Sequence, residues 1–97
     1  MPPVFILSYF VDYTEFSAVS GEKKRVSLRF TNNLLDTMVD RFGTGVNVSY
    51  YADGERHFVV NTEIAISDQF YGWLCGFRKM AKIVSPPDVV DDFQRFL

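Results

Sequence analysis

The sequence predicts an α+β domain with the ferredoxin-like order β-α-β-β-α-β, an antiparallel sheet, and one additional C-terminal helix. Three observations lead to this fold class. Several short segments alternate apolar and polar residues with a period of two, which is typical of strands with one buried face. Two intervening segments repeat apolar residues at helical spacing. The dipeptide Asp53-Gly54 predicts a tight hairpin between the two middle strands. Right-handed crossovers then place both helices on one face of the sheet.

The first half of the domain supplies a strand, a helix and a hairpin. The first strand starts at Arg25, and its inward residues are Val26, Leu28 and Phe30. Residues 31–33 offer N-caps for a helix whose apolar positions are Leu34, Leu35, Met38, Val39 and Phe42. Gly43 is the expected stop of that helix. The next strand is predicted from Val46, Val48 and Tyr50, and the return strand from Phe58, Val60, Thr62 and Ile64.

The second half supplies two helices and a short strand. Ser67 is the expected N-cap of a helix whose buried stripe is Phe70, Trp73, Leu74 and Phe77. Ala81 and Ile83 indicate the last strand. Ser85 is then expected to cap the C-terminal helix, with Pro86 at its first position and Asp88 in its first turn. The apolar side of that helix is predicted to be Val89, Phe93, Phe96 and Leu97.

Residues 1–24 differ from the rest of the chain. The stretch Val4–Tyr13 is apolar and aromatic but has no clear period, and a polar turn at residues 20–24 follows it. We interpret residues 1–24 as an N-terminal connector or a remnant of a preceding domain, and residues 25–97 as the folded domain.

Composition narrows the class of protein. With 97 residues the chain can form one domain, and 47% hydrophobic residues are enough for a core. The formal charge of −2 predicts no general attraction to nucleic acid or to anionic membranes. A single cysteine, Cys75, and the lack of a signal peptide or membrane span predict a cytoplasmic protein.

The residues that could perform chemistry are few and scattered, so we expect no enzyme, no metal and no cofactor. His57 is the only histidine, and it is expected on a strand surface. Asp36 and Asp40 share a helix face without a third ligand. Cys75 lies in an apolar helix, where packing is its usual role. Gly43-Thr44-Gly45 lacks the lysine and the spacing of a phosphate-binding loop.

The open face of the predicted sheet is the first candidate for binding. Its candidate ligand-binding residues are Arg25, Arg29, Tyr51, His57 and Asn61. The third strand lacks the glycine of RNA-recognition domains, which argues against that class of single-strand reader. A free-standing domain that binds a small anionic ligand or a single-stranded oligonucleotide remains an alternative function.

The second predicted helix is the candidate interface. Gly72 and Gly76 are four residues apart, so they line one strip, which favours either helix–sheet packing or a subunit contact. Tyr71 lies off the buried stripe and is expected to be partly exposed beside that strip, as an interface anchor.

The segment Ile66–Phe77 contains Phe-Tyr-Gly-Trp and a second glycine, and Ala81–Pro87 ends in Ser-Pro-Pro. Together with the strand Val26–Phe30 and the sequence Asp40–Gly43, this resembles the C-terminal extension, or WCX domain, of bacterial WYL-domain transcriptional regulators. Arg78 departs from the pattern, because many members have a glycine there.

The resemblance covers about residues 16–97, and the first fifteen residues match poorly. It implies a regulatory module that mediates dimerisation and couples ligand sensing to DNA binding. The expected partners are a second copy of the chain, in a homodimer, and the WYL and helix-turn-helix domains of the same regulator. The implied effector is a nucleotide or oligonucleotide, and DNA is contacted only through the helix-turn-helix domain, which this sequence does not contain.

Overall fold

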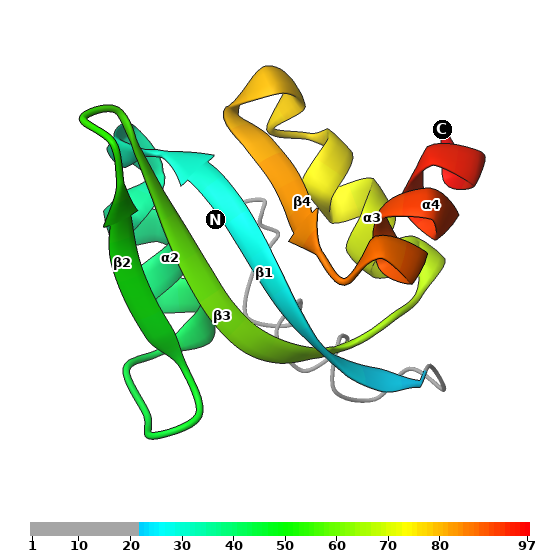
Figure 1. The fold of residues 1–97 in the computed structure, drawn as a ribbon, viewed down its shortest axis with the longest axis horizontal. Coiled ribbons are helices and arrows are strands. Elements are labelled where there is room, and N and C mark those ends of the chain that lie inside the picture. Colours follow the sequence, from blue (N-terminus) through cyan, green and yellow to red (C-terminus); the bar gives the residue numbers. More distant parts are fainter. Residues whose placement is uncertain (1–21) are drawn as a thin grey trace.

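A computed structural model describes residues 22–97 of the chain (Figure 1). The strands are β1 (Lys23–Thr31), β2 (Ser49–Asp53), β3 (His57–Ala65) and β4 (Ala81–Ser85). The helices are α2 (Leu35–Phe42), α3 (Asp68–Cys75) and α4 (Pro87–Phe96), with short 3-10 turns η1 (Asn32–Leu34) and η2 (Arg78–Met80). The predicted β-α-β-β-α-β order with a C-terminal helix is confirmed. None of the helices within residues 22–97 is long and apolar enough to cross a membrane.

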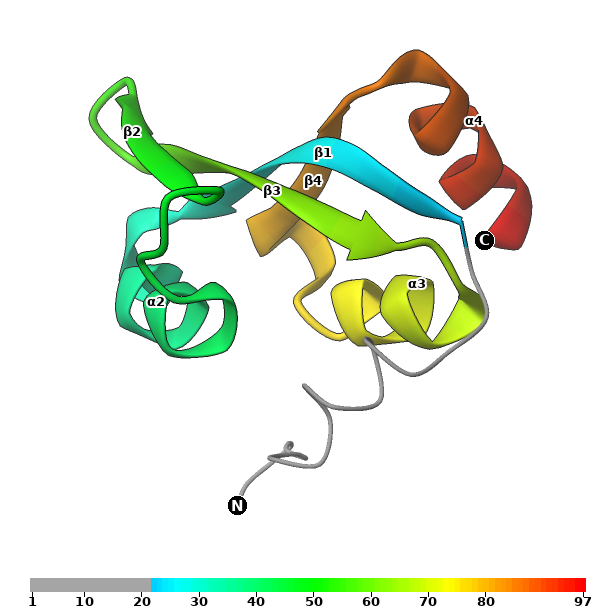
Figure 2. The same cartoon turned by 90° about the horizontal axis from the view of Figure 1, so that it is seen from below.

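The four strands form one antiparallel sheet in the order β2-β3-β1-β4, which is the ferredoxin-like order. Helices α2 and α3 lie together on one side of this sheet (Figure 2). Helix α4 lies beyond the β4 edge, next to α3, in both views (Figures 1 and 2). No helix among residues 22–97 covers the opposite face of the sheet, which we call the open face (Figure 2).

The core lies between the sheet and the two helices. Because side chains alternate along a strand, every second residue of β1 and β3 points to the helices. The most deeply buried side chains are Leu28, Phe30, Met38, Val60, Phe70, Leu74 and Val89. Phe30 and Phe58 contact each other across the two central strands, with ring centroids 5.7 Å apart. Among the described phenylalanines, Phe30, Phe58 and Phe70 are buried in this core, and Phe42, Phe77 and Phe93 pack against it partly buried.

The ends of the two crossover helices are fixed by hydrogen bonds. Ser67 accepts a hydrogen bond from the Phe70 amide at 3.2 Å, as its predicted role as N-cap requires. Gly43 ends α2 with a φ of 79°, a conformation that favours glycine. The Tyr50 hydroxyl donates to the Gly43 carbonyl at 2.6 Å, which ties the end of α2 to β2. Burial of this phenol raises the pKa of Tyr50 above its usual value.

Several predictions about the first half were wrong in detail. The second strand starts at Ser49, and Val46 is fully exposed in the loop before it. The hairpin loop has three residues, 54–56, although Gly54 takes the expected positive φ of 76°. The side chains of residues 31–33 do not cap α2, because a 3-10 turn occupies Asn32–Leu34 instead.

The start of α4 and the N-terminal boundary also differ from expectation. Ser85 ends β4, Pro86 is the N-cap residue, and Pro87 occupies the first helical position, so the predicted cap and first position each move by one residue. Asp88 lies in the first turn, as predicted. Leu97 is 75% exposed and does not belong to the apolar side of the helix. The boundary drawn after residue 24 falls inside β1, and residues 1–21 of the predicted connector lie outside the described residues.

Candidate functional site

The open face of the sheet is built from cross-strand rows of side chains. The antiparallel register places Lys82, Arg29, Val59 and Tyr51 side by side across all four strands. The next row contains Ser27, Asn61 and Ser49, and the row on the other side contains Thr31, His57 and Asp53. All five predicted ligand-binding residues therefore share this face, as the period-two pattern predicted.

Arg29 is the centre of the face. Its Nε atom lies 3.0 Å from Oδ2 of Asp53 in an ion pair, and its Nη2 lies 3.4 Å from Nδ1 of His57. The Nε–H does not point along the line to the carboxylate, so this pair lacks a directional hydrogen bond. Val59 lies between Arg29 and Tyr51 in its row and is only 3% exposed, so the long side chains around it cover the strand. The Arg29 side chain is partly exposed, although its Nε atom is buried.

The three remaining predicted residues, Asn61, Arg25 and Tyr51, differ in their contacts. Asn61 accepts a hydrogen bond from Ser27 and donates to the Ser49 hydroxyl at 3.3 Å, so its amide is committed to neighbours. Arg25 donates to the carbonyl of Asn47 at 2.9 Å and is directed toward the loop before β2. Tyr51 is 52% exposed and presents its ring to solvent. The structure thus brings Arg29, His57 and Tyr51 together and leaves Arg25 at the margin.

The open face has an excess of positive charge. Its described cations are Lys23, Arg25, Arg29 and Lys82, and its described carboxylates are Asp53 and Glu63. Four positive charges minus two negative ones give +2, whereas the whole chain carries −2. The face can therefore attract an anion, although the chain as a whole cannot. Lys82 and Asp53 were missed from the sequence, although each lies in phase with a predicted residue of the face.

The predicted interface residues on α3 behave differently from one another. Tyr71 is buried, with 2% of its surface exposed, and the expectation of a partly exposed anchor was wrong. Its ring packs against Phe93 and Phe96, with centroids 5.2 and 5.5 Å away, because α4 covers this side of α3. Gly72 and Gly76 are exposed, so the helix–sheet packing alternative is wrong for them. A Cβ atom added at Gly72 would meet no atom of the described residues 22–97 within 4 Å.

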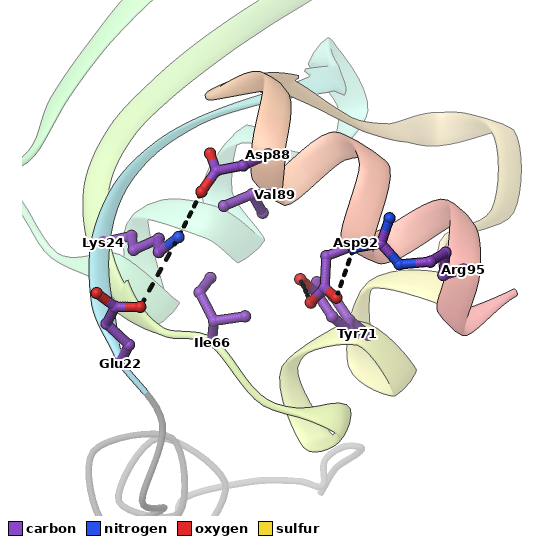
Figure 3. Close-up of a pocket in the computed structure, with 8 residues that line it drawn as sticks. All are labelled: Glu22, Lys24, Ile66, Tyr71, Asp88, Val89, Asp92 and Arg95. Carbon is purple, nitrogen blue, oxygen red and sulfur yellow. Dashed lines mark hydrogen bonds and ion pairs between the residues drawn. The ribbon is translucent and has the colours of Figure 1, made fainter.

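A cleft that the sequence did not predict lies where β1, α3 and α4 meet (Figure 3). It has a volume of about 320 Å³, and its lining residues are Glu22, Lys24, Ile66, Tyr71, Asp88, Val89, Asp92 and Arg95. Lys24 and Asp88 are 64 residues apart in the sequence. No local pattern contains this juxtaposition, so it could not be found before the fold was known.

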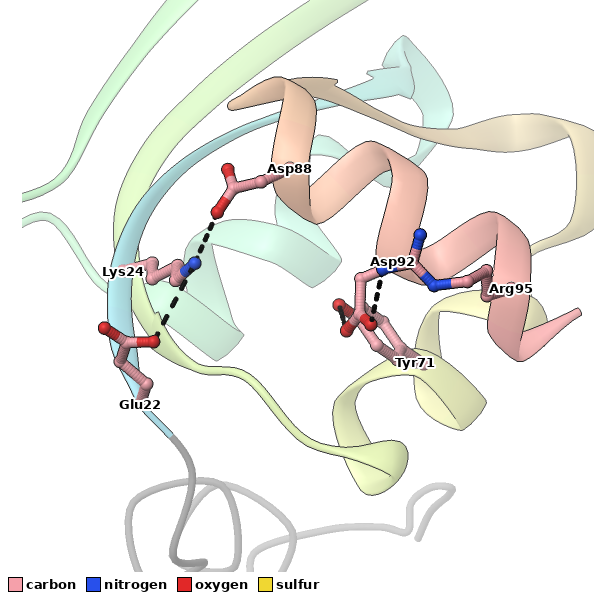
Figure 4. Close-up of polar contacts among 6 residues, drawn as sticks. All are labelled: Glu22, Lys24, Tyr71, Asp88, Asp92 and Arg95. Atoms are coloured by element: carbon pink, nitrogen blue, oxygen red, sulfur yellow. Dashed lines mark hydrogen bonds and ion pairs between the residues drawn. The ribbon is translucent and has the colours of Figure 1, made fainter.

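Two polar contacts cross the cleft (Figure 4). The Lys24 ammonium donates to Asp88 and lies 3.8 Å from Glu22. This contact raises the pKa of Lys24 and lowers the pKa of Asp88, in each case mainly through their mutual hydrogen bond. The Tyr71 hydroxyl donates to Asp92 at 2.6 Å. Burial of the ring, followed by this hydrogen bond, raises the pKa of Tyr71 far above its usual value.

The described part of the chain contains no group of three or more residues that could hold a metal ion. Cys75 is half-buried in α3, and the His57 ring contacts Arg29. The described residues thus form two groups of charged side chains, one on the open face of the sheet and one in the cleft.

The sheet order, the paired helices below it and the open polar face above it define a small α+β domain of the ferredoxin-like class. A family model described as the WCX domain matches residues 22–96. The match spans every element from β1 to α4, so the chain belongs to the WCX domain family. This family match supports the interpretation of the chain as a regulatory C-terminal domain of a regulator. Comparisons with curated proteins and with solved structures gave no match.

Proposed function

We propose that this chain is the C-terminal regulatory module of a bacterial transcriptional regulator, and that it acts by dimerising and by coupling ligand sensing to DNA binding. The observation that carries the proposal is the family match over residues 22–96. In this role the domain supplies contacts and geometry to the WYL and helix-turn-helix domains, and it performs no catalytic step.

The exposed strip on α3 is the surface that we assign to dimerisation. Gly72 and Gly76 lie on the surface, and small residues let a second backbone approach closely. A Cβ atom added at Gly72 meets no atom of residues 22–97 within 4 Å, so a substitution there starts in open space. We therefore expect a large residue at this position to leave the fold of one copy intact. The same residue would block a second copy that approaches the strip.

Sedimentation equilibrium of the chain tests this assignment. We expect the wild-type chain to dimerise and Gly72→Arg to shift it toward the monomer mass. Gly45→Arg is the matched control, because Gly45 also has open space at its Cβ position but lies in the loop before β2. A wild-type chain that stays monomeric at high concentration, or a Gly72→Arg variant that dimerises normally, would contradict the assignment.

A second candidate function is favoured by the charge of +2 on the open face. In this alternative the chain binds a small anion or a single-stranded oligonucleotide, with Arg29 and Lys82 as the cations and Tyr51 as a stacking surface. Titration with nucleotides and short single-stranded DNA at low and moderate salt tests it. Salt-sensitive binding that Arg29→Gln weakens and Lys79→Gln leaves unchanged would support the alternative, because Lys79 lies in the turn η2, outside the rows of the open face.

A further inference from the structure

The cleft between β1, α3 and α4 has the shape of a small ligand site. Its floor is apolar, because Val89 and Tyr71 are each 2% exposed and Ile66 lies beside them (Figure 3). Charged side chains form the walls, from β1 on one side and from α4 on the other. The volume of about 320 Å³ is at the lower end of the range for ligand pockets. A volume of this size suits a molecule of a few carbon atoms.

The charge of the walls selects the kind of ligand. Three carboxylates, those of Glu22, Asp88 and Asp92, face two cations, Lys24 and Arg95, which leaves a net charge of −1. An anion would meet an excess of negative charge, and a neutral apolar molecule would leave the charged groups without water. A cation is the class that this balance favours.

Hydrogen-bonding capacity leads to the same conclusion. An ionised carboxylate offers about four acceptor positions. Glu22 and Asp88 share Lys24 as a cationic partner, and all three carboxylates are at least half exposed, so acceptor positions remain on each. The Lys24 ammonium, by contrast, already serves two carboxylates. The carboxylates of the walls therefore have unused hydrogen-bond acceptor positions. The ligand that complements them is a positively charged hydrogen-bond donor.

The apolar floor specifies the rest of the molecule. An inorganic cation would gain nothing from Ile66 and Val89. An ammonium with a short hydrocarbon stem would bury that stem against them and remove apolar surface from water. Asp88 and Asp92 are four residues apart and lie on one face of α4 (Figure 4). Their carboxylates would therefore lie along the hydrocarbon stem of such a ligand.

We propose that this cleft is a binding site for a small organic amine, whose ammonium group is held by Asp88 and Glu22 and whose apolar stem lies on Ile66 and Val89. The amine replaces Lys24 as the partner of Asp88. The site is separate from the open face of the sheet, and binding there does not depend on the proposed function in transcription. The contact between Lys24 of β1 and Asp88 of α4 joins the two ends of the described domain. Binding of the amine replaces this contact by one between the ligand and Asp88.

The full chain, titrated with n-butylamine hydrochloride and followed by amide chemical shifts, tests the proposal. A probe with so few atoms is expected to bind with a Kd on the order of 1 mM. The shifts should saturate and should be centred on Ile66, Val89 and Asp92. Sodium butyrate at equal ionic strength controls for salt and for the stem, and it should produce no saturable shifts there.

Two substitutions should change the affinity in opposite directions. Asp88→Asn removes a carboxylate from the wall and should weaken binding about fivefold. Lys24→Met keeps the apolar stem of the lysine but removes the competing ammonium, so it should strengthen binding. Asp91→Asn is the matched control, because Asp91 is an exposed carboxylate of the same helix that does not line the cleft.

The proposal is overturned if n-butylamine gives no saturable shifts at the cleft, or if butyrate gives the same ones. It is also overturned if Asp91→Asn weakens binding as much as Asp88→Asn, since the effect would then come from net charge alone. Weaker binding to Lys24→Met would show that the lysine holds the ligand rather than competing with it, which contradicts the assigned contacts.

Discussion

The hydrogen bond between Tyr71 and Asp92 gives the sharpest test of how α4 is attached to the domain. The substitution Tyr71→Phe removes the hydroxyl that donates to Asp92 at 2.6 Å and keeps the ring. The ring contacts with Phe93 and Phe96 remain available, so the change isolates one polar interaction.

The size of the effect follows from the exposure of the two partners. A hydrogen bond to a charged group contributes about 1.5–3 kcal/mol to folding stability. The Asp92 side chain is 50% exposed, so water can solvate it once the hydroxyl is gone, and no buried charge is left without a partner. We therefore expect the low end, about 1.5 kcal/mol, which corresponds to a fall in Tm of roughly 6–12 °C for a domain of this size.

Urea unfolding followed by circular dichroism measures this difference in the free energy of unfolding. The matched control is Tyr51→Phe, because Tyr51 is 52% exposed, and its loss of a hydroxyl should change stability by less than about 0.5 kcal/mol. A Tyr71→Phe variant as stable as the wild type would refute the reasoning. It would show that the bond between α3 and α4 contributes nothing beyond the packing of the rings.

Three further predictions concern single positions. The pKa of the Tyr71 phenol is raised in the folded state, so its contribution to folding stability is complete below pH 10, near the usual pKa of the residue, and is lost as the pH rises further. The stability difference between the wild type and Tyr71→Phe should therefore shrink above pH 10. A constant difference would contradict this. Ser67→Ala should cost about 1 kcal/mol in urea unfolding through loss of the α3 N-cap, and no cost would contradict the cap. Arg78 has a positive φ of 56°, so Arg78→Gly should stabilise the chain by about 0.5 kcal/mol and raise its thermal midpoint. A destabilised variant would show that contacts of the arginine side chain contribute more to stability than the relief of backbone strain.

The order of elements was predictable because its signals are local. Alternation of Val26, Leu28 and Phe30 is enough to define a strand and its buried face, and the structure buries all three. The same alternation predicts that Arg29 and Tyr51 share the open face, and the strand register confirms it. The positive φ of Arg78 gives a physical reason for the glycine that the resemblance implies at this position, because glycine adopts that conformation more easily. Nothing in the structure explains the arginine that stands there instead.

The errors arose where distant segments decide the outcome. Tyr71 is off the stripe that faces the sheet, and the sequence of α3 does not reveal that α4 covers its other side. The cap of α4 was misplaced because two consecutive prolines follow Ser85, and either could occupy the first helical position. The cleft depends on contacts between the start of β1 and α4, which only the complete fold brings together.

The central claim is that this domain regulates a DNA-binding protein through contacts between two copies. The most direct measurement is the affinity of a regulator that contains this domain for its promoter DNA, compared between the wild type, Gly72→Arg and Gly45→Arg. A dimer holds two half-sites at once, so Gly72→Arg should bind the promoter much more weakly, while Gly45→Arg should bind like the wild type. A Gly72→Arg regulator that binds its promoter with unchanged affinity would contradict the claim.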